Sequence, residues 1–145
     1  MIDFYDTMKS QFLTFEQALE LYHLGFDGPG FACYNTDGHF FIRHIDAYCM
    51  GADDYCSNSH HLFSDRGIFI APLKQQVFAW FRERHDLFGC VDLQACTPSH
   101  WYIRIDKIEI NDYLYHSEDE HLRFDTYEKA ETACIQKLIE ITKNK

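Results

Sequence analysis

The fold of this 145-residue chain is decided by the stretch APLKQQVFAWFRER, which runs from Ala71 to Arg84. Pro72 suits the first turn of a helix, because a backbone N–H at that position would have no partner within the helix. Residues with large side chains then recur at spacings of three and four, which predicts one broad, mainly apolar stripe along the helix. They are Leu73, Val77, Trp80, Phe81 and Arg84. We expect a helix here whose two large rings, Trp80 and Phe81, anchor the core.

Length and composition indicate one globular domain spanning residues 1–145. The chain has the usual size of a single domain and is long enough to bury a core. Hydrophobic residues make up 46% of it and aromatic residues 17%, which excludes a disordered or low-complexity chain. With 13 Phe and 9 Tyr, the core should be built largely from rings.

The charge balance is acidic. The chain has 23 Asp and Glu against 13 Lys and Arg, a net charge of −10. Such a chain repels a phosphate backbone and attracts basic partners, so nucleic acid is not the expected ligand. The run from Trp80 to His85 does mix aromatic and basic residues, as single-strand nucleic-acid sites do. We expect its rings to face the core instead.

Nothing at the N-terminus resembles an export signal, since residues 1–6 are acidic and lack an apolar core. No apolar run approaches membrane-spanning length, so we expect no membrane association and a cytoplasmic location. Four of the six cysteines lie among apolar neighbours, which predicts buried, reduced thiols. These are Cys33, Cys90, Cys96 and Cys134.

The elements before the central helix are a helix and a hairpin. Thr14 and Gln17 fit a capping box and predict a helix that ends near Gly25. Residues 31–34 and 39–43 predict two strands around a tight turn at 35–38. Residues 44–66 show no periodicity and predict a long excursion, and residues 68–70 predict a short buried strand.

The elements after the central helix are a second hairpin and a last helix. Residues 90–95 and 101–106 predict paired strands, and residues 108–113 either prolong the second strand or begin another. Residues 117–121 predict an acidic loop, and Thr126 caps a final helix. The whole order predicts an α+β fold, an antiparallel sheet of about four to six strands with three helices packed mainly on one face.

A resemblance to a known group rests on these three helices. Its residues are TFEQA at 14–18 with LGFD at 24–27, AP at 71–72 with QQ at 75–76 and WFRE at 80–83, and TYEKAE at 126–131 with AC at 133–134 and KLIEI at 137–141. They resemble a group of small uncharacterised proteins encoded by phages and prophages of Bacteroidetes-type bacteria. Residues 44–66 and 112–124 take no part in the likeness. The group has no activity, and so no functional residues, to carry over. The resemblance implies a small accessory protein of the host cytoplasm that binds host or defence components.

The best metal candidate lies in the irregular segment. His44, Cys49, Cys56 and His60, with His61 beside them, supply the ligand types that zinc prefers. Cys49 and Cys56 are seven residues apart, however, whereas structural zinc sites carry close cysteine pairs. We favour a polar loop with half-buried cysteines and keep a zinc-binding domain of residues 44–61 as the alternative.

A cysteine nucleophile is a further hypothesis, with Cys90 or Cys96 beside His85 or His100. No glycine turn or helix N-terminus for an oxyanion accompanies either cysteine, so we interpret both as core thiols.

Two carboxylate pairs also occur, Asp53 with Asp54, and Asp92 with Asp106 across the paired strands. Such pairs bind Mg²⁺ or divide acid and base roles, but no phosphate-binding, dinucleotide or hydrolase motif accompanies them. We interpret them as surface charge.

Non-enzymatic binding of a protein of host or phage origin is therefore the leading functional hypothesis. A homodimer is a further option for the partner. The alternatives are the zinc-binding domain and a small hydrolase or small-molecule binder, which would need a pocket with convergent polar groups.

Overall fold

The computed structural model describes residues 3–28, 30, 32–42 and 67–145. They belong to two compact units, residues 1–76 and 77–145. The predicted α+β class with antiparallel pairing is confirmed. The six described strands form two sheets of three rather than one sheet, in the orders β2-β1-β3 and β4-β5-β6. The expectation of a single domain stays a prediction.

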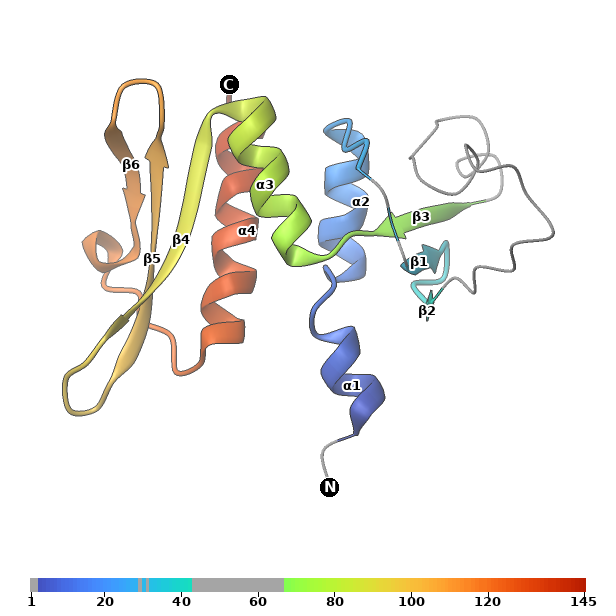
Figure 1. The fold of residues 1–145 in the computed structure, drawn as a ribbon, viewed down its shortest axis with the longest axis horizontal. Coiled ribbons are helices and arrows are strands. Elements are labelled where there is room, and N and C mark those ends of the chain that lie inside the picture. The colour runs from blue at the N-terminus through green and yellow to red at the C-terminus, as the bar shows by residue number, and fades with distance from the viewer. Residues whose placement is uncertain (1–2, 29, 31, 43–66) are drawn as a thin grey trace. The chain divides into compact units, whose positions relative to one another are not determined.

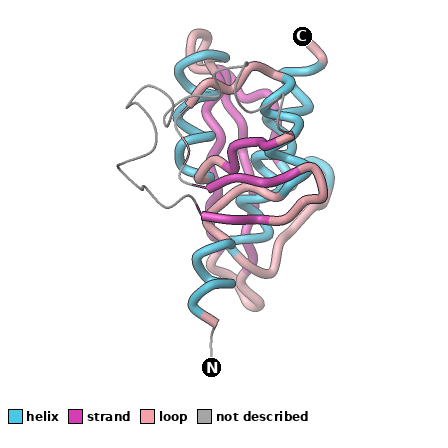
Figure 2. Tube along the Cα trace, turned by 90° about the vertical axis from the view of Figure 1, so that its right-hand side faces the viewer, coloured by secondary structure: helices cyan, strands magenta, loops and turns pink. Residues whose placement is uncertain are grey.

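The first unit contains two helices, α1 (Phe4–Lys9) and α2 (Phe15–His23), and the first sheet (Figures 1 and 2). Its strands are β1 (Ala32–Asn35), β2 (Phe40–Ile42) and β3 (Ile68–Ala71). β1 lies between the other two, and Cys33 is opposite Phe41 on one side and Ile70 on the other. Helix α1 was not predicted from the sequence. Its six residues bury no side chain, so they give no apolar stripe to recognise.

Local side-chain chemistry fixes the ends of these elements. The Thr14 hydroxyl accepts a 3.3 Å hydrogen bond from Gln17 N–H, as the capping box predicts. In the turn between β1 and β2, the Asn35 side-chain oxygen accepts from Asp37 N–H and His39 N–H at 3.0 and 2.9 Å. Gly38 has φ +79°, a conformation that costs glycine least. The predicted hairpin is confirmed by these contacts and by its register.

An aromatic cluster fills the first unit. The ring of Tyr34 lies 5.6 Å from that of Phe15 and 5.4 Å from that of Phe40, and Phe12 lies 5.3 Å from Phe40. The Tyr34 hydroxyl donates a 2.7 Å hydrogen bond to the carbonyl oxygen of Leu13. The expected ring-built core is therefore present in this unit.

Helix α3 (Lys74–His85) is the helix predicted from the stretch at 71–84. It begins two residues after Pro72, and the Gln76 side chain accepts from Leu73 N–H at 3.0 Å across its first turn. Trp80 and Phe81 are buried, as predicted, and so are Val77 and Phe78. Residues 82–84 are exposed, so Arg84 does not extend the buried stripe.

The second unit packs helix α4 (Tyr127–Lys143) against one face of the second sheet (Figure 1). The strands are β4 (Leu87–Gln94), β5 (His100–Lys107) and β6 (Asp112–His116), followed by a 3-10 turn, η3 (Ser117–Glu120). Gly89 permits the close approach of α4, because an added Cβ would lie 2.9 Å from Leu138 Cδ1 and 3.0 Å from Cys134 Sγ. Thr126 caps α4 as predicted, its hydroxyl accepting from Lys129 N–H at 3.2 Å.

The turn between β5 and β6 settles the choice left open for residues 108–113. Residues 108–111 form a turn, and β6 is a separate strand. Asp86 holds this turn from a distance in sequence, because its two carboxylate oxygens lie 3.1 and 3.0 Å from Glu109 N and accept its N–H. The Asp86 carbonyl also accepts from Ile108 N–H at 3.1 Å.

Across the described ranges, no helix has both the length and the apolar character needed to span a bilayer.

Candidate functional site

The second sheet has one apolar face and one polar face. Ile103 and Ile105 are buried on the face that packs against α4, whereas Tyr102, Arg104 and Asp106 alternate with them and lie on the other. The register adds side chains from both neighbouring strands to that second face. We call it the polar face, although Phe88 also lies on it, opposite Asp106. Its other members are Cys90, Asp92, Gln94, His100, Tyr102, Arg104, Asp106, Tyr113 and His116.

A row of charged and thiol groups crosses the polar face. Arg104 Nε donates to Asp106 Oδ2 at 3.0 Å, and the Cys90 thiol donates to Asp92 Oδ2 at 3.6 Å. Burial raises the pKa of Cys90 to about 11, the Asp92 carboxylate adds to this rise, and Arg104 opposes it. Cys90 is thus a neutral thiol near pH 7, which argues against it as a nucleophile.

The proposed meeting of Asp92 and Asp106 across the strands is wrong. Asp92 is opposite Tyr102 and Asp106 is opposite Phe88, so four residue positions separate the carboxylates along the register. Asp106 is instead paired with Arg104. The interpretation of these carboxylates as separate surface charges agrees with this arrangement.

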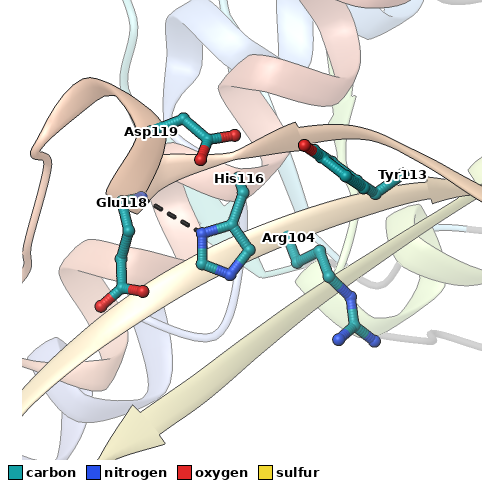
Figure 3. A pocket seen from close by; sticks show the side chains of 5 residues that line it. All are labelled: Arg104, Tyr113, His116, Glu118 and Asp119. Atoms are coloured by element: carbon teal, nitrogen blue, oxygen red, sulfur yellow. Dashed lines mark hydrogen bonds between the residues drawn. The ribbon is translucent and has the colours of Figure 1, made fainter.

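A shallow depression of about 280 Å³ lies at one end of the polar face (Figure 3). Its lining residues come from β5, β6 and η3: Arg104, Tyr113, His116, Glu118 and Asp119. His116 is fixed in place, since its Nδ1 accepts from Glu118 N–H at 3.3 Å and its ring stacks on Tyr102 with centroids 4.9 Å apart. Two carboxylates and one guanidinium line the hollow, a mixture suited to an amine or guanidinium group beside a ring.

A second cluster begins in the turn between β4 and β5. Cys96 Sγ lies 3.5 Å from His100 Nδ1, and His100 Nε2 lies 3.7 Å from Glu118 Oε1. The His100 residue is 8% exposed, and its Nε2 is inaccessible to solvent and just beyond hydrogen-bond length from that carboxylate. The imidazole therefore lies between a thiol and a carboxylate, and of these three groups only the imidazole is buried.

The cysteine prediction is correct for Cys33 and Cys134, which are buried free thiols. It is wrong for Cys96, which is exposed because it lies in the turn rather than on a packed strand. Cys90 is intermediate. Of the suggested histidine partners, His100 lies beside Cys96, whereas the ring of His85 packs on Trp80 at 4.5 Å.

An apolar surface at the β5–β6 turn was not foreseen. Four side chains there are exposed: Ile108 at 46%, Ile110 at 58%, Tyr113 at 58% and Leu114 at 43%. We call them the apolar tip. In the sequence, the alternation of apolar and polar residues over 108–113 is typical of a strand. The structure shows instead that Ile108 and Ile110 lie in a turn, where they have no sheet to pack on.

The candidate zinc ligands His44, Cys49, Cys56 and His60 lie outside the described residues, as do Asp53 and Asp54. Among the residues that the structure does describe, no group of three or more His, Cys, Asp or Glu side chains is arranged to hold a metal ion. The zinc-binding alternative stays a prediction.

Comparisons of the chain with protein-family models, with curated proteins and with solved structures give no match. The candidate site therefore rests on its own geometry.

Proposed function

We propose that this protein acts by binding a protein partner through the polar face and the apolar tip of its second sheet. The observation that carries the proposal is the exposure of Ile108, Ile110, Tyr113 and Leu114 beside the carboxylates of the depression. Large apolar side chains that are exposed near polar groups are typical of protein contact sites.

The partner surface should be basic and partly apolar. Asp92, Asp106, Glu118 and Asp119 set four carboxylates on or beside the polar face against the single guanidinium of Arg104. The net charge of −10 extends the same preference over long range and should speed the approach of a basic partner. Tyr113 belongs both to the depression and to the apolar tip, so one bound segment can meet both.

The source of the partner is proposed from the resemblance to phage and prophage proteins. A host or phage protein, including a host defence component, in the bacterial cytoplasm is the partner we propose. Self-association through the apolar tip is the competing outcome. We favour a different, basic partner, because a second copy of this chain would bring an equally acidic surface.

The test is a pull-down from bacterial lysate with matched surface variants. Ile110→Ser removes apolar area from the tip, and Asp119→Lys reverses a charge at the depression. Glu83→Lys is the control, since Glu83 is also exposed but belongs to α3. We expect the affinity for the partner to fall about tenfold in each of the two test variants, a change near 1.4 kcal/mol in binding free energy. The control should keep its affinity.

Retention of the same partner by all three variants would place the contact elsewhere and refute the proposal. Sedimentation of the purified chain separates the competing outcome. A dimer that Ile110→Ser converts to monomer would show that the tip is used for self-association.

A further inference from the structure

We propose that Cys96 is a nucleophilic thiol that exchanges with low-molecular-weight disulfides, with His100 as its base and Glu118 as the residue that positions His100. This inference is independent of the protein-binding proposal. It assigns a reversible modification site to the turn between β4 and β5.

The geometry supplies the parts that such a site needs. Cys96 is exposed, so a disulfide in solution can reach its sulfur. His100 Nδ1 lies 3.5 Å from that sulfur, within reach of the thiol proton. Glu118 Oε1 lies 3.7 Å from Nε2 on the other side of the ring. A carboxylate there favours the tautomer with hydrogen on Nε2, which leaves the Nδ1 lone pair free to accept.

The burial of His100 makes this more than a chance contact. Its ring is held in the sheet opposite Gln94, whereas Cys96 lies in the exposed turn that joins the two strands. The imidazole is thus fixed and the thiol is accessible, the arrangement expected of a base and its nucleophile. The Pro98 carbonyl, 3.2 Å from Sγ, is a second acceptor for the thiol proton and competes with His100 in the resting state.

The reaction balances without any further reagent. The Cys96 proton passes to His100 Nδ1, and Sγ attacks one sulfur of the disulfide. The new S–S bond forms as the old one breaks, and the departing thiolate takes the proton from His100. The products are one mixed disulfide on Cys96 and one free small thiol.

Disulfide exchange makes fewer demands on this turn than acyl transfer does. Acyl transfer requires N–H donors aimed at a developing oxyanion. Beside this thiol, the Cys96 N–H is already donated to Gln94 O at 3.0 Å, and Pro98 has no N–H. Disulfide exchange requires no such donors, because the charge in its transition state is spread over sulfur atoms.

Cys90 provides an internal comparison on the same sheet. Its thiol has the Asp92 carboxylate for a partner, at 3.6 Å, and no imidazole is among the groups that shift its pKa. A carboxylate disfavours the thiolate, so Cys90 should react slowly under conditions in which Cys96 reacts fast.

The experiment uses the full chain, reduced and then freed of reductant. It is incubated with oxidised glutathione at pH 7, and adducts are located by peptide mass mapping, which assigns each cysteine separately. We expect Cys96 to form the mixed disulfide at least about tenfold faster than Cys90. Reduced glutathione should be released mole for mole with the adduct.

Variants test the roles of the two partners. His100→Gln should slow the reaction of Cys96 by about tenfold. Because His100 is buried, its variant needs a thermal unfolding check, and Glu118, which is more exposed, gives a second measurement. Glu118→Ala should slow the reaction by about threefold, and Glu118→Gln should recover part of the rate, because it keeps an oxygen acceptor for Nε2–H.

Glu83→Gln, at an exposed carboxylate of α3, is the matched control and should leave the rate unchanged. Equal rates at Cys96 in the wild type, His100→Gln and Glu118→Ala would show an ordinary exposed thiol and overturn the proposal. So would faster modification of Cys90 than of Cys96.

Discussion

The phenol of Tyr34 donates a 2.7 Å hydrogen bond to the Leu13 carbonyl and so joins β1 to the segment that leads into α2. Tyr34 is only 3% exposed. Its burial raises its pKa to about 12, and nearby Glu16 and Tyr5 act in the same direction. The bond is therefore a buried one whose loss leaves a carbonyl without its partner.

Tyr34→Phe should lower the free energy of unfolding by about 1–2 kcal/mol, because the Leu13 carbonyl stays buried and loses its donor. Urea unfolding measures this. Tyr5→Phe is the matched control, since the Tyr5 hydroxyl donates a longer bond of 3.3 Å to Phe40 O and its residue is 45% exposed. A loss in the control as large as that in Tyr34→Phe would contradict the assignment.

The raised pKa of Tyr34 makes a separate prediction about pH. A group that ionises at about 10 in the unfolded chain and about 12 in the folded chain stabilises the fold fully below pH 10. That contribution is lost as the pH rises through 12. Tyr115 also has its pKa raised to about 12, so the test compares the wild type with Tyr34→Phe. Stability should fall less steeply above pH 10 in the variant.

The lowered pKa of His85 predicts the opposite dependence of stability on pH, a loss of stability as the pH falls. Burial lowers its pKa, and the Lys145 ammonium acts in the same direction. The unfolded chain then binds the proton more tightly, so the stability linked to His85 is complete above pH 6.5 and declines as the pH falls toward the folded-state pKa. An NMR titration of the His85 ring should give a midpoint below 6.5. A midpoint at or above that value would refute the prediction.

Gly89→Ala should destabilise the second unit by about 1–3 kcal/mol, because the new methyl group would overlap Leu138 and Cys134. A double-mutant cycle with Cys134→Ala is the check. Removing the sulfur makes room for the methyl group, so Gly89→Ala should cost less in the Cys134→Ala background. Additive costs would show that the methyl group is accommodated elsewhere.

The elements that could be predicted from sequence are those with local causes. Thr14 and Thr126 cap their helices through hydroxyls that bond three residues ahead, and the Asn35 turn closes within five positions. The division into two sheets depends on long-range pairing, which no local pattern encodes. The exposure of Ile108 and Ile110 was missed for the same reason.

The candidate site shows the same division. Alternation along residues 101–106 correctly placed Tyr102, Arg104 and Asp106 on one face. The position of Cys96 was wrong because residue type predicts its burial, whereas the register of Gln94 opposite His100 puts it in the turn. The approach of His100 to Glu118 could not be foreseen, because η3 is distant in sequence from His100.

The anchoring of the β5–β6 turn by Asp86 has a consequence for recognition. Because both carboxylate oxygens accept from Glu109 N–H, the isoleucines of the apolar tip are presented in one fixed backbone conformation before any partner arrives. A preorganised loop loses little conformational entropy on association, so more of the contact energy becomes affinity. In the complex that we propose, Asp86 would therefore favour binding from its position between α3 and β4, without being a contact residue itself.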